Sequence, residues 1–107
     1  MKRKKIIRAD LDHIIHKIID NYQPEKIILF GSIAKGDSTE TSDYDLLVIK
    51  PTATPRLRRR AEVFKDITYN IPIDLIVLTP EEIQTLLNNK SLFIHEILEE
   101  GVVLYEH

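Results

Sequence analysis

Short apolar segments alternate with amphipathic ones along the 107-residue chain, and this alternation limits the possible folds more than any other feature. Residues 26–30, 43–49, 72–78 and 102–105 are predicted strands, because each is short, largely apolar and followed by a glycine or polar residues. The order is helix, strand, turn, strand, helix, strand, helix, helix, strand. It predicts the α/β (α+β) class, with one mixed sheet of about four strands flanked by helices. The length predicts one domain, residues 1–107.

Helical spacing locates the first two helices. The first carries its apolar residues on one stripe, made of Ile7, Leu11, Ile14, Ile15 and Ile18. We expect this helix to end near Asn21, before the break at Pro24. Pro55 opens a second helix, whose predicted apolar side consists of Leu57, Ala61, Phe64 and Ile67 or Thr68.

The last two helices have the clearest start signals. Thr79 is a predicted N-cap, Pro80 suits the first helical position, and Glu82 completes a capping box. Ser91 is expected to cap the final helix, which should end at Gly101 because glycine commonly follows the last helical turn.

The composition excludes several classes of protein. The chain has no cysteine, which excludes disulfides, thiolate catalysis and zinc sites built on cysteine. No apolar run approaches the roughly 18 residues that span a membrane. Residues 2–5 are basic, but Asp10, Asp12 and His13 interrupt the apolar stretch that a signal peptide needs. We therefore expect a cytoplasmic protein with no membrane partner.

Charge is divided unevenly along the chain. Residues 1–60 carry 13 Lys or Arg against 8 Asp or Glu, and residues 61–107 carry 2 against 9. A basic first part suits phosphates, and an acidic second part suits a basic partner. Two solvated faces of opposite charge account for the same pattern.

Two smaller charged clusters have a simple interpretation. Four arginines among residues 56–60 oppose the dipole of a helix start, which suits a phosphate-rich partner. A solvated face paired with Glu62 and Asp66 is the favoured alternative. His13 and His16 have a spacing that can hold a metal, but they lie opposite the apolar stripe, so we expect solvated histidines.

A candidate anion site follows the first strand. Gly31 lies at the carboxyl end of that strand, where the missing Cβ lets a ligand approach the backbone. Ser32 opens a helical turn ending at Gly36, so its hydroxyl and the free amides face outward and can bind a polyphosphate. Lys35 lies one turn on and can add a positive charge.

Three aspartates form a candidate metal site. Asp43 and Asp45 are two residues apart, which places both carboxylates on one face of a strand. Asp74 interrupts an apolar strand, where an unpaired carboxylate is costly. If the two strands are neighbours, the three carboxylates can hold two Mg²⁺ ions, the arrangement for displacement at a phosphate.

These residues together carry a resemblance. Gly31-Ser32, ten intervening residues, Asp43-Tyr44-Asp45 and then Asp74 on a following strand resemble the signature of the DNA polymerase β-like nucleotidyltransferase superfamily. The flanking sequences FGSxAxG (30–36) and SDxDL (42–46) are similar to the minimal nucleotidyltransferase (MNT) family. The resemblance covers residues 27–78, and its motif is more specific for the superfamily than for a substrate.

The resemblance implies a role for each acidic residue. Asp43 and Asp45 would bind both metal ions, and Asp74 would bind the catalytic ion and help deprotonate the attacking hydroxyl. The hydroxyl would attack the α-phosphorus of a nucleoside triphosphate, with ATP favoured by the resemblance, and release pyrophosphate. Positioning and charge neutralisation would supply most of the rate.

The resemblance also assigns the phosphate contacts. Gly31 and Ser32 would hold the β- and γ-phosphates, with Lys35 assisting. Family members often carry arginine where this chain has Lys35. Lysine keeps the charge but lacks the two-pronged hydrogen bonding of arginine, so Lys35 departs from the pattern.

The acceptor is expected on another protein, because the chain leaves few residues for a second substrate pocket. In the family the usual partner is a HEPN-domain toxin, neutralised by transfer of AMP to a tyrosine, in an oligomer with its partner. The apolar positions of the last helix and the acidic residues of the second part of the chain offer a docking surface. Those acidic residues are Glu96, Glu99, Glu100 and Glu106.

Two other functions stay open. One is a catalytically silent module that neutralises a partner by contact alone, without needing the three carboxylates. The other is nucleic-acid binding through residues 2–5 and 56–60, which is disfavoured because no aromatic platform lies beside those charges. The acceptor, the preferred base and the oligomeric state are not specified by the sequence.

Overall fold

The computed structural model describes residues 9–36 and 43–107, which form four strands and five helices in this part of the chain. In chain order the elements are α1 (Ala9–Tyr22), β1 (Lys26–Phe30), α2 (Gly31–Lys35), β2 (Tyr44–Ile49), α3 (Arg56–Val63), β3 (Ile73–Leu78), α4 (Pro80–Asn88), α5 (Leu92–Glu100) and β4 (Val102–Glu106). The predicted order of elements is confirmed.

The four strands form one mixed sheet in the order β3-β2-β1-β4. β1 pairs antiparallel with both β2 and β4, whereas β2 and β3 are parallel. The carboxyl end of β1 therefore meets the amino ends of β2 and β3 at one end of the sheet. This end is called the acid end below, because Asp45 and Asp74 lie there. The predicted fold class is confirmed.

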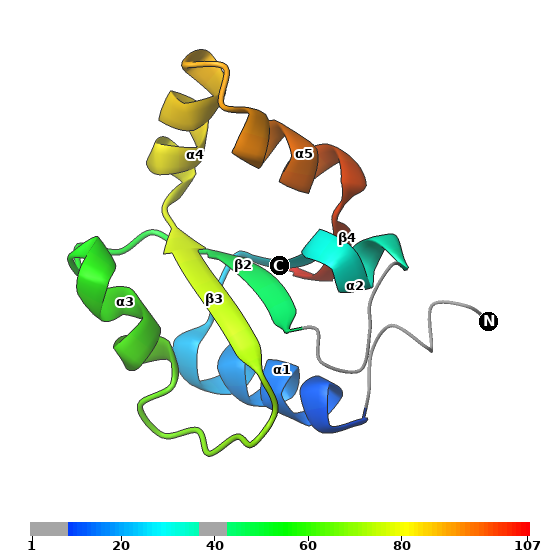
Figure 1. Cartoon of the computed structure of the whole chain (residues 1–107). Helices are drawn as coiled ribbons and strands as arrows, with labels where there is room; N and C mark the ends of the chain where they lie inside the picture. Colours follow the sequence, from blue (N-terminus) through cyan, green and yellow to red (C-terminus); the bar gives the residue numbers. More distant parts are fainter. Residues whose placement is uncertain (1–8, 37–42) are drawn as a thin grey trace.

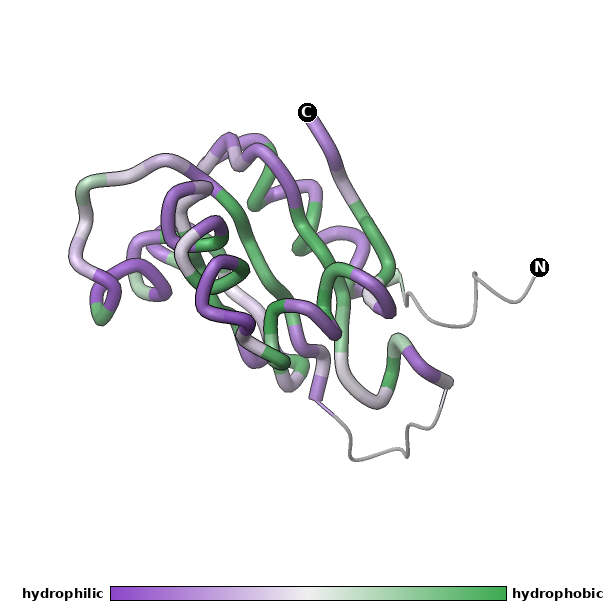
Figure 2. Tube along the Cα trace, turned by 90° about the horizontal axis from the view of Figure 1, so that it is seen from above, coloured by the Kyte–Doolittle hydropathy of each residue, from purple (hydrophilic) through white to green (hydrophobic). Residues whose placement is uncertain are grey.

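Helices cover both faces of the sheet, as Figure 1 shows: α1 and α3 lie on one side, and α4 and α5 on the other. The alternation of side chains along each strand divides the core between these layers. In β1, Ile27 and Leu29 pack toward α1, and Ile28 packs toward α5. Figure 2 shows the strands as a largely hydrophobic layer within the molecule.

The predicted apolar stripe of α1 is confirmed, since Leu11, Ile14, Ile15 and Ile18 are all buried. The helix ends at Tyr22, one residue beyond the prediction. Gln23 then adopts a positive φ of 54°, which turns the chain toward Pro24 and β1. Ile7 and the basic residues 2–5 lie outside the described residues.

The predicted apolar side of α3 is confirmed only in part: Phe64 and Ile67 pack in the core just beyond the helix, but the two predicted residues inside the helix do not. Leu57 is 98% exposed and Ala61 is also exposed, whereas Arg59 and Val63 face the interior. Leu57 is two residues from Arg59, so burying one exposes the other on the helix. Arg59 takes the buried position because its guanidinium finds a carboxylate and two backbone carbonyls there.

The caps of α4 and α5 are confirmed. The Thr79 hydroxyl accepts from the Glu82 N–H, and the Glu82 carboxylate accepts from the Thr79 N–H. Ser91 caps α5 by accepting from the Ile94 N–H. No helix in the described ranges is long and apolar enough to cross a membrane.

β4 brings the chain back along the edge of the sheet beside β1. Because the two strands are antiparallel, β4 starts near the acid end and finishes at the opposite end. There the His107 N–H donates to the Glu25 carbonyl at 2.9 Å.

Candidate active site

Two of the three predicted acidic residues lie directly side by side. Asp45 on β2 and Asp74 on β3 are register partners in the parallel pair, so their side chains point to the same face of the sheet. Asp43 precedes β2 by one residue, and its spacing from Asp45 suits the same face. The condition for bringing Asp74 beside Asp45, that their two strands are neighbours, is thus met.

Electrostatic repulsion marks this group of carboxylates. Asp45 is half-buried, and burial raises the pKa of its carboxyl group, with further contributions from the negative charges of Asp74 and Asp43. Across residues 9–36 and 43–107, no Lys, Arg or His lies within ion-pair distance of any of the three. Their mutual repulsion therefore has no compensating protein cation in this part of the chain.

The donor chemistry suits a hard divalent cation. Within the described residues, no three His, Cys, Asp or Glu side chains already surround a metal position. Magnesium does not require such a cage, because it is commonly held by one or two carboxylates and completed by phosphate oxygens and water. Asp45, with Asp74 beside it and Asp43 exposed nearby, can supply that partial set of ligands.

Gly31 connects the end of β1 to α2 in direct contact with Asp45. Its φ is +81°, and a Cβ added there would lie 2.2 Å from Asp45 Oδ2. Both observations favour glycine at this position, because any side chain would strain the backbone and displace the Asp45 carboxylate. The following turn is helical over Gly31–Lys35 and is closed by Gly36 in the left-handed conformation, as predicted. Ser32 is exposed at the start of the turn.

Lys35 lies at the end of α2 and contacts α5. Its Nζ is 3.4 Å from Glu100 Oε1 in an ion pair. Between the two helices lies a cavity of about 90 Å³, lined in part by Gly31, Lys35, Phe93 and Glu100. The sequence pointed to the charge of Lys35 but not to its partner, which is distant along the chain.

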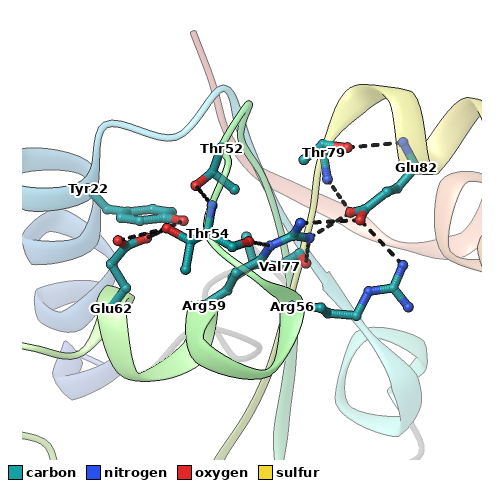
Figure 3. A network of polar contacts seen from close by, with 9 residues as sticks. All are labelled: Tyr22, Thr52, Thr54, Arg56, Arg59, Glu62, Val77, Thr79 and Glu82. Carbon is teal, nitrogen blue, oxygen red and sulfur yellow. Dashed lines mark hydrogen bonds and ion pairs between the residues drawn. The ribbon is translucent and has the colours of Figure 1, made fainter.

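Two residues of the arginine cluster, Arg56 and Arg59, form a polar network at the other end of the sheet (Figure 3). Arg59 is only 6% exposed. Its Nη1 and Nη2 donate to the two carboxylate oxygens of Glu82 at 2.6 and 3.2 Å. The same side chain donates to the carbonyls of Thr54 and Val77. It thereby joins α3 and α4 around the edge strand β3.

The predicted pairing of these arginines with Glu62 and Asp66 is not found among the described contacts. Arg56 instead lies 3.5 Å from Glu82. Glu62 accepts from the hydroxyls of Thr54 and Tyr22. The capping-box motif identified Glu82 as a cap residue. No local signal in the sequence links Glu82 to Arg59, which lies 23 residues earlier.

Arg60 on α3 and the two histidines on α1 are exposed. Arg60 donates to the Tyr69 hydroxyl and to the Ile73 carbonyl. His13 and His16 are both exposed, as expected for solvated histidines. His16 Nδ1 lies 3.5 Å from Asp12 Oδ2 on the same helix.

The chain belongs to the family described as "Polymerase beta, Nucleotidyltransferase", whose model matches residues 13–107. The resemblance identified from the glycine-serine turn and the acidic residues is thereby confirmed. The predicted class of enzyme, a nucleotidyltransferase, is confirmed at the level of the family.

Two relatives come from Methanocaldococcus jannaschii. The chain is 34% identical over 88 residues to "Putative protein adenylyltransferase MJ1305", a match covering 75% of this chain and 60% of that protein. It is 38% identical over 84 residues to "Putative protein adenylyltransferase MJ0604", covering 76% and 78% of the two chains. The chain thus spans less than two thirds of the length of the first of these relatives.

Two solved structures share the fold. One is the crystal structure of a "putative nucleotidyltransferase" from Sulfolobus solfataricus, with a TM-score of 0.61 and 23% identity, covering 89% of this chain and 76% of that chain. The other is the crystal structure of a toxin-antitoxin with AMP-PNP, with a TM-score of 0.54 and 20% identity, covering 90% and 73%.

Proposed function

We propose that this protein transfers AMP from ATP to a hydroxyl group of a partner protein. The observation that supports this most directly is the register of Asp45 and Asp74 on adjacent parallel strands, with Gly31 against Asp45. A glycine-led turn beside a pair of carboxylates combines a place for a polyphosphate with a place for its cations. Membership in the nucleotidyltransferase family and the names of the relatives agree with this reaction.

Each site residue has a defined task in the proposed reaction. Asp43, Asp45 and Asp74 would hold two Mg²⁺ ions, which would neutralise phosphate charge when bound. The backbone and hydroxyl of Gly31 and Ser32 would bind the β- and γ-phosphates, with the Lys35 ammonium contributing charge.

The chemical step is a displacement at phosphorus. The acceptor oxygen forms a bond to the α-phosphorus, while the bond from that phosphorus to the bridging oxygen of the β-phosphate breaks. Asp74 accepts the hydroxyl proton, and pyrophosphate leaves with the bridging oxygen. No covalent intermediate with the protein is required, because positioning and charge neutralisation lower the barrier.

The proposed acceptor is a tyrosine of a HEPN-domain toxin, and the chain would act as the antitoxin. The fold shared with a toxin-antitoxin that contains AMP-PNP is consistent with such a pairing. α5 presents apolar side chains to solvent near the acid end, with Leu92 78% and Phe93 48% exposed. Together with the acidic residues of the same helix, they offer a surface for a partner that carries basic residues.

A binding experiment tests the nucleotide site first. Calorimetric titration with Mg²⁺ and ATP should show binding to the wild-type chain and none to an Asp43→Asn, Asp45→Asn double variant. Asp20→Asn, which removes an exposed carboxylate on α1, is the matched control and should bind normally. A folded wild-type chain that binds no nucleoside triphosphate would contradict the proposed activity.

A labelling experiment tests the reaction. With a HEPN-domain protein as acceptor, ATP labelled on the α-phosphorus should transfer its label, whereas ATP labelled on the γ-phosphorus should not. Transfer of the γ label would indicate a kinase. A silent binding module, which neutralises a partner by contact alone, is the alternative. It predicts that Asp74→Asn leaves neutralisation of the toxin intact.

A further inference from the structure

The Lys35 ammonium, which the proposed function assigns to the nucleotide phosphates, already forms an ion pair with a carboxylate. Lys35 Nζ lies 3.4 Å from Glu100 Oε1, and the two side chains are 47% and 54% exposed. In residues 9–36 and 43–107, Glu100 is the one carboxylate within ion-pair distance of Lys35. A phosphate that binds Lys35 must therefore compete with Glu100.

Packing at both ends of α5 fixes the backbone that carries Glu100. A Cβ added to Gly101 would lie 2.5 Å from Ile28 Cγ2 and 2.5 Å from the Ile97 carbonyl oxygen, so the end of the helix lies against β1. Near the start of α5, Phe93 packs edge-on against Phe30, with ring centroids 5.8 Å apart. The carboxylate can change rotamer, but the helix cannot readily carry it away from α2.

The cavity between α2 and α5 is small, and this limits how a nucleotide can reach Lys35. The cavity there is about 90 Å³, and both Glu96 and Glu100 line it. Sites for small-molecule ligands usually measure about 300–1,000 Å³. A whole nucleoside triphosphate is therefore too large for this cavity. Phosphates bound on α2 beside Lys35 would lie near two carboxylates that repel them.

We propose that Glu100 is a positioning residue that sets the affinity of the site for nucleoside triphosphates. Without nucleotide it holds the Lys35 ammonium on the α5 side of the turn. When a triphosphate binds at α2, Lys35 leaves Glu100 for the phosphate oxygens, and the separation of the pair weakens the observed affinity. This inference rests on the proposed function, since it needs a triphosphate bound beside Lys35.

Titration of the full chain with ATP in the presence of Mg²⁺ tests the proposal. Glu100→Gln should lower the dissociation constant about two- to fivefold, the range expected for releasing an exposed ion pair. Lys35→Gln should weaken binding, and adding Glu100→Gln to it should bring much less gain than in the wild-type background. Glu96→Gln is the matched control, because it removes the same charge from the same cavity without freeing Lys35.

The outcomes separate this proposal from the proposed function. A gain in Glu100→Gln that exceeds the gain in Glu96→Gln and depends on Lys35 supports the exchange of partners. Equal gains in the two glutamine variants, or unchanged affinity in Glu100→Gln, would overturn it while leaving the nucleotide site established. No binding of ATP to either wild type or Glu100→Gln would overturn the proposed function, and this inference with it. Thermal unfolding of each variant verifies that the chain stays folded.

Discussion

The two ends of the central sheet differ in whether their charged side chains are paired. At the acid end, Asp45 and Asp74 are neighbours, and no cation of the described residues pairs with them. At the far end, Arg59 forms a two-pronged ion pair with Glu82 and also donates to two carbonyls.

This difference separates charges that stabilise the fold from charges that cost it stability. The Arg59 hydrogen bonds lower the pKa of Glu82 from 4.5 to about 2, which is the mark of a favourable pair. The pKa of Asp45 moves the other way, because burial and two like charges disfavour its ionised form. Carboxylates left unpaired in this manner are candidates for binding or catalysis.

The largest expected effect is on activity at the acid end. Asp45→Asn and Asp74→Asn should each reduce nucleotide transfer by about 10²–10³-fold, because each removes charge stabilisation from the transition state. Single-turnover transfer from α-labelled ATP measures this. If either variant retained wild-type rates, the unpaired carboxylates would not be the reacting centre.

The next effect is on stability at the far end. Arg59→Met should cost about 3 kcal/mol of unfolding free energy, because Glu82 and two carbonyls lose their donor. Urea denaturation measures the cost, and ATP binding should survive under native conditions. Arg58→Met is the matched control on the same helix, since Arg58 is exposed, and should change stability by less than about 0.5 kcal/mol.

A smaller effect should follow from pH. Because the pKa of Glu82 falls from 4.5 to about 2 in the folded protein, its pair with Arg59 contributes fully above pH 4.5. That contribution is lost as the pH falls toward 2, and roughly 2 to 3 kcal/mol should go with it. Denaturation curves measured from pH 5 to pH 2 should show this loss, and Arg59→Met should flatten it.

The smallest expected effect is the contribution of Asp45 to the pH dependence of stability, which has the opposite sign to that of Glu82. The folded-state pKa of Asp45 is raised, so between its unfolded and folded values the folded protein binds more protons than the unfolded chain. Stability from this group therefore falls as pH rises through that window. Asp45→Asn should consequently raise the melting temperature slightly at neutral pH, although it strongly reduces nucleotide transfer. A lowered melting temperature would mean that the ionised carboxylate has a stabilising partner.

The sequence was sufficient for features that depend on neighbours along the chain. Thr79 and Glu82 form their capping box within one turn, and Gly31 ends β1 where an apolar run stops. The proximity of Asp45 and Asp74 could also be predicted, because a carboxylate inside an apolar strand is costly unless a charged site lies beside it. The roles of these residues in metal and nucleotide binding stay predictions.

What the sequence could not supply are contacts between distant elements. Leu57 looked like the core-facing residue of α3, yet Arg59 occupies that place because Glu82 on α4 is within reach. The partner of Lys35 likewise depends on how α5 packs against α2. In both cases the cationic side chain pairs with a carboxylate on a helix that is distant in the sequence, so the pair depends on tertiary packing.

The course of β4 has a practical consequence for handling the protein. The strand carries the chain away from the acid end, and His107 finishes beside Glu25 at the opposite end of the sheet. An affinity tag or fluorescent protein joined after His107 would emerge on the side away from Asp45 and Asp74. Capture of such a tag on a chip surface would attach the molecule at the end of the sheet opposite Asp45 and Asp74.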